Sequence, residues 1–303
     1  TGQNQQGDIV YEDENILGEL DLFPSINLIY GLKEMSNLRF SLSRTIARPS
    51  FKEKSIAQIF DPVTSTTFIG NIDILPTKIL NYDLRWELFQ EDAQMYAISL
   101  FYKDFTNPIE LVVYNGASPN DYTPKNVDEA IVYGLEFELR KNLKFLSENL
   151  SNFNLTFNTS IIRSEEIMDE KEYEGRIKSA RSGEVVSRKR ELQGQSPFLV
   201  NLGLNYNSIN NNFEGSLNYN VQGKTLQIVG VNYVPDIFTE PFNSLNLNFN
   251  YKFGRTGNLK LGLGIKNLLD EKVESYYYTN DIKSIYSSLS PRREFKLSIG
   301  INF

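Results

Sequence analysis

Apolar and polar residues alternate along most of the chain with a period of two. In one such stretch the apolar row is Leu80, Tyr82, Leu84, Trp86 and Leu88, and the polar row is Asn81, Asp83, Arg85 and Glu87. The same alternation recurs at 131–139, 153–161, 200–206, 245–253, 259–265 and 295–303. Because successive side chains of a strand point to opposite faces, the pattern predicts strands with one apolar and one polar face.

The links between the predicted strands alternate in length. We place the strands at 23–33, 37–48, 78–89, 95–106, 128–140, 151–163, 197–207, 212–224, 243–253, 258–267 and 292–303. Short links (34–36, 90–94, 141–150, 208–211 and 254–257) alternate with long ones (49–77, 107–127, 164–196, 225–242 and 268–291). In an antiparallel sheet every second link lies at the same end, so the alternation places all the long links at one end of the sheet. Short turns, long loops and alternating strands of about ten residues are typical of an antiparallel transmembrane β-barrel in the outer membrane.

A soluble β-sandwich or β-solenoid is the main alternative, because its strands would also alternate. The polar rows carry Asn, Lys, Glu and Arg, as expected of a water-filled lumen. Aromatic residues gather near strand ends, for example Phe101 with Tyr102 and Tyr251 with Phe253, which suits the girdles at membrane interfaces. A sandwich also gives no reason for long loops at one end only. These features favour an all-β fold of the barrel class.

One segment departs from the alternation. Phe40 and Leu42 share a row with Arg44 and Arg48, although a lipid-facing Arg costs about 2–4 kcal/mol near the middle of a bilayer. Either a β-bulge at Ser43 reverses the faces, or Arg44 lies at the outer rim. We favour the bulge.

The number of predicted strands is odd, whereas bacterial single-chain barrels have even numbers. Our count is about eleven, half of the roughly 22 strands of the plugged outer-membrane transporters. We therefore expect residues 1–21 to form an extracellular loop and residues 22–303 to form the strands and loops of one portion of a larger barrel. The count depends on 109–114, which would change it if that segment joined the barrel wall.

Composition excludes several classes of function. The chain has 31 Lys and Arg against 38 Asp and Glu, a net charge of −7, which disfavours binding to duplex nucleic acid. The absence of Cys and His excludes disulfides, thiolate metal sites and the common catalytic triads. Chemistry based on carboxylates alone is not excluded, but no residue pair favours it. We expect no enzyme activity, no metal and no cofactor.

Several segments, taken in order, resemble the TonB-dependent receptors of the outer membrane. They are LSRTIARPSF (42–51), NYDLRWELF (81–89), ISLFYKDFTNPIE (98–110), YGLEFELRKNL (133–143), QSPFLVNLGLNY (195–206), GIKNLLDEKVE (264–274) and FKLSIGINF (295–303). The match corresponds to the C-terminal half of the barrel. It implies a 22-stranded barrel in a Gram-negative bacterium that encloses a plug and imports a scarce nutrient with energy from TonB. Usual cargoes are siderophores, haem, metal chelates, cobalamin, glycans and peptides.

The resemblance also implies partners. Neither a plug nor a TonB box is present in this chain, so contact with the TonB complex is expected through an N-terminal segment outside it. Phe303, a terminal phenylalanine at the end of an alternating strand, resembles the signal that the barrel-assembly machinery recognises. Outer-membrane lipid and lipopolysaccharide are further expected contacts, and nucleic acid is not expected as a partner. The sequence does not decide whether a surface lipoprotein covers the barrel as a lid. The alternatives are a passive or scaffolding barrel and a secreted carbohydrate-binding β-protein.

The resemblance places the ligand between the plug and the inward-facing loops and wall. Candidate ligand residues in the long links are Tyr114, Asn115, Asn232, Tyr233, Tyr276, Tyr277 and Tyr278. Tyrosine offers a flat apolar face and a hydroxyl, which suits sugars or aromatic chelators. The alternative is that these rings pack the loops together or belong to the girdle.

Charged residues of the polar rows are candidates for the lumen lining. They are Asp83, Arg85, Glu87, Glu136 and Glu138, which could line a path or contact the plug. Their alternative role is a network of paired charges that stabilises a wet interior. The basic residues between Arg176 and Arg190 follow an acidic run, which favours a self-neutralising exposed loop.

Overall fold

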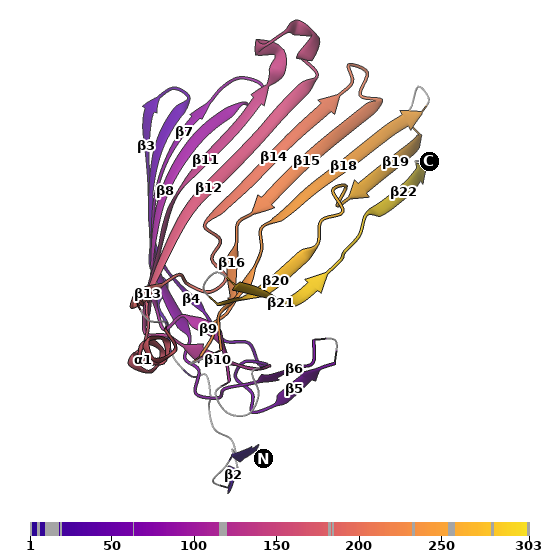
Figure 1. Ribbon diagram of the computed structural model, residues 1–303. Coiled ribbons are helices and arrows are strands. Elements are labelled where there is room, and N and C mark those ends of the chain that lie inside the picture. The colour runs from indigo at the N-terminus through magenta and orange to yellow at the C-terminus, as the bar shows by residue number, and fades with distance from the viewer. Residues whose placement is uncertain are drawn as a thin grey trace.

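The computed structural model describes residues 2–4, 7–9, 18, 20–62, 64–114, 120–180, 183, 185–231, 234–253, 258–279 and 282–301. A wide, curved wall of tilted antiparallel strands dominates it (Figure 1). Most of the additional elements gather at one end of this wall. We call that end the loop end and the opposite one the turn end.

The wall contains every strand that the alternation predicts, with ends that agree within a few residues. In sheet order the strands are β3 (Ser25–Lys33), β4 (Ser36–Ala47), β7 (Thr77–Phe89), β8 (Met95–Thr106), β11 (Glu129–Asn142), β12 (Phe153–Ile167), β14 (Phe198–Asn207), β15 (Phe213–Gln222), β18 (Phe242–Phe253), β19 (Leu259–Lys266) and β22 (Glu294–Ile301). A two-residue strand, β13 (Lys189–Arg190), pairs with the end of β12. The predicted antiparallel all-β wall is therefore confirmed.

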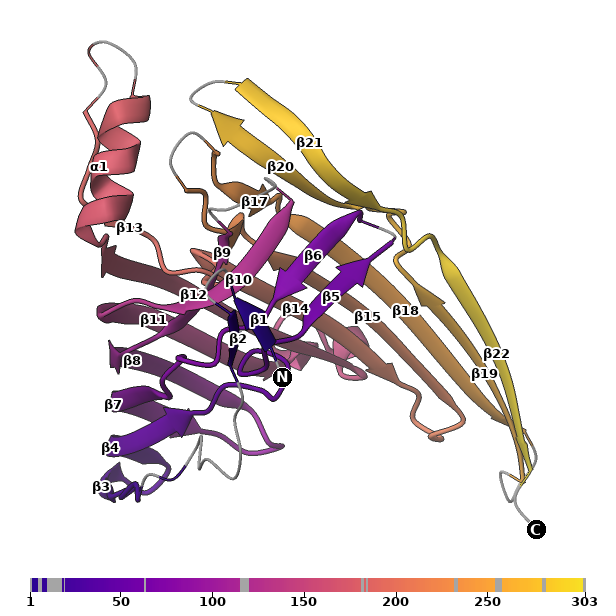
Figure 2. The ribbon, with the colours of Figure 1, turned by 90° about the horizontal axis from the view of Figure 1, so that it is seen from below.

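The apolar row of the wall is not covered by protein in the described residues. Leu84, Leu100 and Leu135 lie on one face and expose 40%, 51% and 42% of their surface. No second sheet packs over these strands in the part of the chain that the structure describes, and the loop elements lie within the curve of the wall (Figure 2). A β-sandwich would bury this row against a second sheet. The sandwich alternative is therefore wrong.

The expected β-bulge at Ser43 is also wrong. The pairing of β4 with β7 runs without a shift from Ser36 opposite Leu88 to Ala47 opposite Thr77. Arg44 therefore keeps the face of Leu42 and lies opposite Leu80. It is near the loop-end terminus of β4, where a lipid-facing Arg costs only about 0–1 kcal/mol.

The long links are more ordered than the sequence predicts. They carry β5 (Gln58–Asp61), β6 (Thr66–Ile69), β9 (Ile109–Val113), β10 (Asp121–Asn126), α1 (Glu170–Ser179), β16 (Thr225–Ile228), β17 (Ile237–Thr239), β20 (Val273–Thr279) and β21 (Ile282–Leu289). Two four-stranded sheets result, in the orders β5-β6-β10-β9 and β16-β17-β20-β21. Strand β9 lies in a loop sheet and not in the wall, so the wall count stands.

Smaller elements complete the described chain. Two short 3-10 helices, η1 (Leu143–Phe145) and η2 (Glu148–Leu150), form the link between β11 and β12 at the turn end. Near the N-terminus, β1 (Gly2–Asn4) pairs with β2 (Gly7–Ile9). Among the described residues, no helix has the length and apolar character needed to cross a membrane.

The wall is an open sheet in the described residues. Its two edge strands, β3 and β22, each pair on one side only, and all their residues are exposed. An exposed edge presents a row of unpaired peptide groups. The end of the chain at Phe303, expected to carry an assembly signal, lies outside the described residues.

Candidate functional site

The two loop sheets are joined into one packed unit, which with α1 we call the loop body. The Val113 amide donates to the Val229 carbonyl at 3.0 Å, and the Val229 amide donates to the Leu111 carbonyl at 3.1 Å. Tyr122, Ile228 and other buried side chains pack together between the sheets. Five links that are far apart in sequence therefore form a single structure over the loop end of the wall.

Gln193 fastens two parts of the loop body through its side-chain amide. The Leu111 amide donates to Gln193 Oε1 at 2.6 Å, and Gln193 Nε2 donates to the Leu111 carbonyl at 3.1 Å. The same nitrogen also donates to the Gln227 carbonyl. One glutamine side chain therefore continues the hydrogen bonding of β9 and connects it to β16. No pattern in the sequence singles out this residue.

Arg190 is the centre of a buried ion network. Its guanidinium is 2.6 Å from Glu110 Oε2 on β9, 2.7 Å from Glu166 Oε1 on β12 and 2.8 Å from Glu172 Oε1 on α1. The Arg190 side chain is only 7% exposed. The network therefore connects the wall, a loop sheet and the helix through one cation.

Three carboxylates around one guanidinium leave excess negative charge, and the pKa values respond. Glu166 is the second-to-last residue of β12, a strand of 15 residues, and so lies beyond the about 9–11 residues that span a bilayer. Burial, together with the charge of Glu110, raises the pKa of Glu166. Burial opposes ionisation of Glu110 too, but its hydrogen bonds from Arg190 lower the Glu110 pKa. The arrangement favours a protonated Glu166 beside an ionised Glu110.

A second arginine fixes helix α1 to the rest of the loop body. Arg176 donates two hydrogen bonds to the Asp236 carboxylate at 2.8 and 2.9 Å, and its Nη2 also lies 3.0 Å from Glu172. Asp169 caps the helix by accepting a hydrogen bond from the Glu172 amide at 2.8 Å. Three further cations of the basic run are also paired: Lys178 with Glu174, Arg188 with Glu170, and Lys189 with Glu165. The expected self-neutralising charge pattern agrees with this geometry, and Arg181 lies outside the described residues.

The three consecutive tyrosines of β20 have different surroundings. Tyr277 packs edge-on against Tyr286, which in turn accepts a hydrogen bond from Tyr122 within the core of the loop body. Burial raises the pKa of Tyr277. The Tyr276 hydroxyl donates to Glu274 at 2.7 Å, at the surface. Tyr277 therefore contributes to packing, and a ligand role for this cluster stays a prediction.

Tyr278 belongs to an aromatic cage around a lysine. Lys224 Nζ lies 3.2 Å from the centre of the Tyr278 ring and 4.2 Å from the centre of the Phe238 ring. The Tyr278 hydroxyl donates to the Glu240 carboxylate. Partial burial lowers the pKa of Lys224. Of the other predicted ligand residues, Tyr114 is partly exposed just after β9, whereas Asn115, Asn232 and Tyr233 lie outside the described residues.

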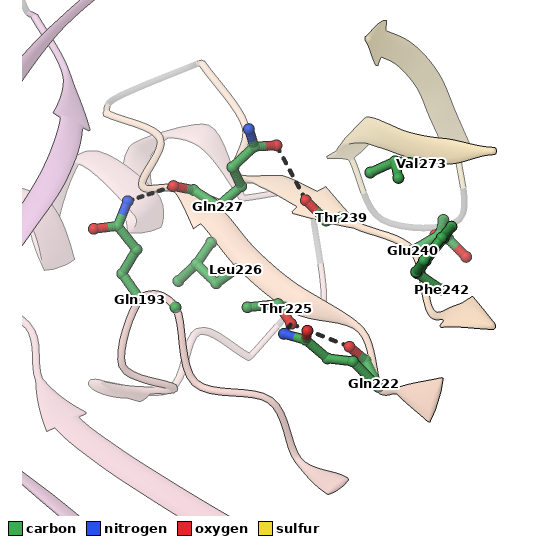
Figure 3. Close-up of a pocket in the computed structure, with 11 residues that line it drawn as sticks. Gln193, Gln222, Thr225, Leu226, Gln227, Thr239, Glu240, Phe242 and Val273 are labelled. Atoms are coloured by element: carbon green, nitrogen blue, oxygen red, sulfur yellow. Dashed lines mark hydrogen bonds between the residues drawn. The ribbon is translucent and has the colours of Figure 1, made fainter. Parts of the chain in front are cut away.

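A cavity of about 390 Å³ lies where the wall meets the loop body, and Figure 3 shows its lining. Gln222 and Phe242 are paired across β15 and β18, on the same face of the wall as Asn220. Because this is the polar face, the cavity opens on the lumenal side of the wall. The remaining walls come from strands β16, β17 and β20 and from the segment of Gln193 and Gly194 that follows β13. We call it the vestibule cavity; its lining residues are Gln193, Gly194, Gln222, Gly223, Thr225, Leu226, Gln227, Thr239, Glu240, Phe242 and Val273.

Within the vestibule cavity the polar side chains are preorganised by hydrogen bonds. Gln222 Nε2 donates to Thr225 Oγ1 at 3.3 Å, and Thr239 Oγ1 donates to Gln227 Oε1 at 3.2 Å. Gln222 therefore uses its amide nitrogen in a bond to a threonine, and Gln227 uses its amide oxygen. Leu226, next to Gln227 on β16, is almost fully buried and packs with Val112 and Val229. Sequence alternation identifies Gln222 as inward-facing but does not predict the cavity, because its other walls come from β16, β17 and β20.

The predicted lumenal charges form a connected network on the wall. Arg85 Nε lies 2.8 Å from Glu87 Oε1, and Arg85 Nη2 lies 2.9 Å from Glu138 Oε2. Arg39 joins through Glu87 at 2.6 Å, and Arg140 joins through Glu138 at 2.9 Å. This geometry agrees with the alternative role, a network of paired charges that stabilises a wet interior. The network also includes Arg39 and Arg140, which are not among the predicted residues.

The remaining lumenal candidates lie beside this network. Glu136 accepts a hydrogen bond from Ser160 at 3.4 Å, and Asp83 lies opposite Ser41 on β4. A contact of these residues with a plug stays a prediction. In the described part of the chain, no group of three or more acidic side chains is arranged to hold a metal ion.

Comparisons with known proteins agree with this architecture. The model of the family described as "TonB dependent receptor-like, beta-barrel" matches residues 3–268. No curated protein matches the chain. A solved structure of the ferric enterobactin receptor PfeA from Pseudomonas aeruginosa is similar, with a TM-score of 0.58 at 18% identity over 93% of this chain.

Two other solved structures show the same fold. The ferric citrate transporter FecA has a TM-score of 0.61 at 17% identity, again over 93% of this chain. The siderophore receptor PirA from Acinetobacter baumannii has a TM-score of 0.58 at 14% identity over 93% of this chain. The match covers 40% of PfeA, 38% of FecA and 41% of PirA, so the chain spans well under half the length of these proteins.

Proposed function

The chain belongs to the family of TonB-dependent receptor β-barrels, and from this premise we propose that it forms part of an outer-membrane importer for a scarce nutrient. The importer draws its energy from TonB, through a segment outside this chain. Its place is the outer membrane of a Gram-negative bacterium. Residues 1–21 form an extracellular loop, and residues 22–303 form the C-terminal portion of the barrel.

The uncovered apolar face of the wall is the observation that carries this proposal. Leu100 and its neighbours on this row are exposed, while the opposite face holds paired charges and amides. Hydrocarbon tails are the natural cover for such a face, and water is the natural content of the other. This arrangement also disfavours a secreted carbohydrate-binding protein, because an uncovered apolar surface of this extent promotes aggregation in water.

The open edges support a larger barrel. Peptide groups along β3 and β22 cannot stay unpaired in hydrocarbon, because each unsatisfied group costs several kcal/mol. Further strands of a longer protein would pair with both edges and close the wall. The coverage of solved relatives, at 38–42%, is consistent with such a longer protein.

Growth under nutrient limitation tests the proposal. A strain lacking the gene would be compared with its parent on media that each supply one growth-limiting cargo: a ferric siderophore, haem, cobalamin, an oligosaccharide or a peptide. We expect slow growth of the mutant on one medium, equally slow growth of a strain lacking TonB, and rescue by a large excess of that cargo. Slow growth that does not depend on TonB would instead identify the passive-channel alternative.

A further inference from the structure

The lining of the vestibule cavity has a distinctive chemical composition. Its polar side chains are the amides of Gln193, Gln222 and Gln227 and the hydroxyls of Thr225 and Thr239. Among the described residues of the lining, Glu240 is the only charged one, and it is acidic. A cavity of this size is within the range of small-ligand sites. The described lining residues offer many neutral hydrogen-bonding groups and no positive charge.

The two lysines beside this cavity pack against tyrosine rings, and one of them also pairs with Glu240 of the lining. Lys224 lies over the Tyr278 ring, and Lys283 Nζ lies 4.6 Å from the centre of the Tyr276 ring. Lys283 is also 3.8 Å from Glu240 Oε1. Lys283 is therefore already paired with the carboxylate of the lining, and Lys224 lies over an aromatic ring. In the described part of the chain, an anionic ferric chelate in the cavity would lose its water without meeting a cation free of such a partner, which is unfavourable.

The amide ends of Gln222 and Gln227 suit hydroxyl groups. Each amide uses one end in a bond to a threonine and leaves the other for a ligand, so a sugar hydroxyl could both donate and accept (Figure 3). Phe242 and Val273 supply an apolar surface for the C–H face of a pyranose ring. This combination of fixed amides and an apolar platform matches a neutral carbohydrate.

The lumenal wall continues this neutral chemistry. Asn220 lies on the face of Gln222 and donates to Asn201, and Asn201 donates to Asn158 at 2.6 Å. These three amides come from adjacent strands β15, β14 and β12. A ladder of uncharged amides therefore leads from the vestibule cavity across the wall.

We propose that the vestibule cavity binds a segment of a neutral oligosaccharide and does not bind an anionic ferric chelate. This inference rests on the proposed importer function and narrows its cargo. Gln222 and Gln227 hold the hydroxyl groups, Phe242 packs against the ring, and Glu240 accepts a further hydroxyl.

Calorimetry on the full-length receptor in detergent tests the inference. The probes are maltotetraose, cellotetraose, mannotetraose and xylotetraose, with ferric enterobactin as the anionic probe. We expect saturable binding of at least one neutral tetraose, weakened at least tenfold in the double variant Gln222→Ala/Gln227→Ala. The matched control is Gln94→Ala, because Gln94 lies in the β7–β8 link at the turn end and its side-chain amide donates to the nearby Glu91 carbonyl. Heat-modifiable migration on electrophoresis would verify that each variant is folded.

The outcomes separate this inference from the proposed function. Binding of none of the four tetraoses, or equal binding by the double variant and the parent, overturns the inference. TonB-dependent uptake of ferric enterobactin without tetraose binding overturns it as well and leaves the importer function intact. Tetraose binding without any TonB-dependent uptake supports the cavity assignment and refutes the importer function.

Discussion

Two arginine-centred networks lie at opposite ends of the molecule and differ chiefly in burial. Arg190 in the loop body is 7% exposed and faces Glu110, Glu166 and Glu172. Arg85 near the turn end of the wall is 28% exposed and faces Glu87 and Glu138. The chemical pairing is the same, but the desolvation of the ions is not. From this difference in burial we expect the Arg190 network to be a structural requirement and the Arg85 network to be a modest stabiliser.

Removal of Arg190 is expected to have the largest effect. In Arg190→Met, Glu110 would remain buried without its cation, which typically costs about 3–5 kcal/mol, whereas Glu172 keeps its contact with Arg176. We expect α1 and β9 to lose most of their protection in hydrogen exchange while the wall strands keep theirs. The matched control is Lys178→Met, which removes an exposed cation of the same segment and should leave exchange unchanged. Retained protection of α1 in Arg190→Met would show that the network does not hold the loop body together.

Replacement of Glu166 is expected to stabilise the loop body, whereas Arg190→Met is expected to destabilise it. Both oxygens of Glu166 are buried and accept no well-oriented hydrogen bond, although one lies close to Arg190. Burial raises the Glu166 pKa above its ordinary value of 4.5, so the folded chain holds this proton more tightly than the unfolded chain. The stability of the loop body should therefore fall as pH rises above 4.5 towards the raised pKa.

Glu166→Gln tests this pH dependence, because glutamine keeps the shape without the titrating proton. Between about pH 6 and pH 9 we expect hydrogen exchange of α1, corrected for its intrinsic rate, to accelerate in the parent and to stay constant in the variant. The groups that face Glu166 are Glu110, Glu172 and Arg190. Glu110→Gln is the informative second variant: with one carboxylate gone, the Glu166 pKa should fall and the slope should weaken. Parallel slopes in the parent and Glu166→Gln would contradict the assignment.

Removal of Arg85 is expected to cost less than removal of Arg190. Its partners Glu87 and Glu138 keep Arg39 and Arg140, so neither carboxylate is left without a cation in Arg85→Gln. Hydrogen bonds to charged groups contribute about 1.5–3 kcal/mol, and exposure to lumenal water lowers that figure. A shift of the urea midpoint of the full-length receptor in detergent would measure the effect. A loss as large as that of Arg190→Met would mean that this part of the lumen is dry.

The sequence predicts the wall far better than it predicts the loop body. The strand around Leu84 can be predicted because its alternation is local and extends over most of its length. Loop strands such as β17, with three residues, are too short for a pattern to appear. The role of Arg190 depends on Glu110, 80 residues away, and that of Gln193 on Leu111, 82 residues away. These pairings follow from tertiary packing, which periodicity does not encode.

The candidate site shows the same division. Alternation predicts Arg85, Glu87 and Glu138 on one face, and the strand register brings them close enough to pair. It also places Gln222 on that face, but the vestibule cavity forms only because the β16–β17–β20 sheet closes over it. Residue type makes Tyr277 a candidate ligand residue, but its partial burial in the loop body depends on packing with Tyr122 and Tyr286. Residue type alone does not distinguish a packing ring from a ligand-binding ring.

The smallest effect is expected for a charge pair that is exposed on both sides. Lys144 and Glu148 lie 3.5 Å apart at the turn end, with side chains 60% and 82% exposed. Such pairs contribute about 0.3–0.5 kcal/mol, because water screens both ions and ordering two long side chains costs entropy. Lys144→Gln should therefore leave the urea midpoint of the full-length receptor within error at ordinary salt. A shift comparable to that of Arg85→Gln would mean that Lys144 has a partner beyond Glu148, and an additional chain covering the turn end would then be required.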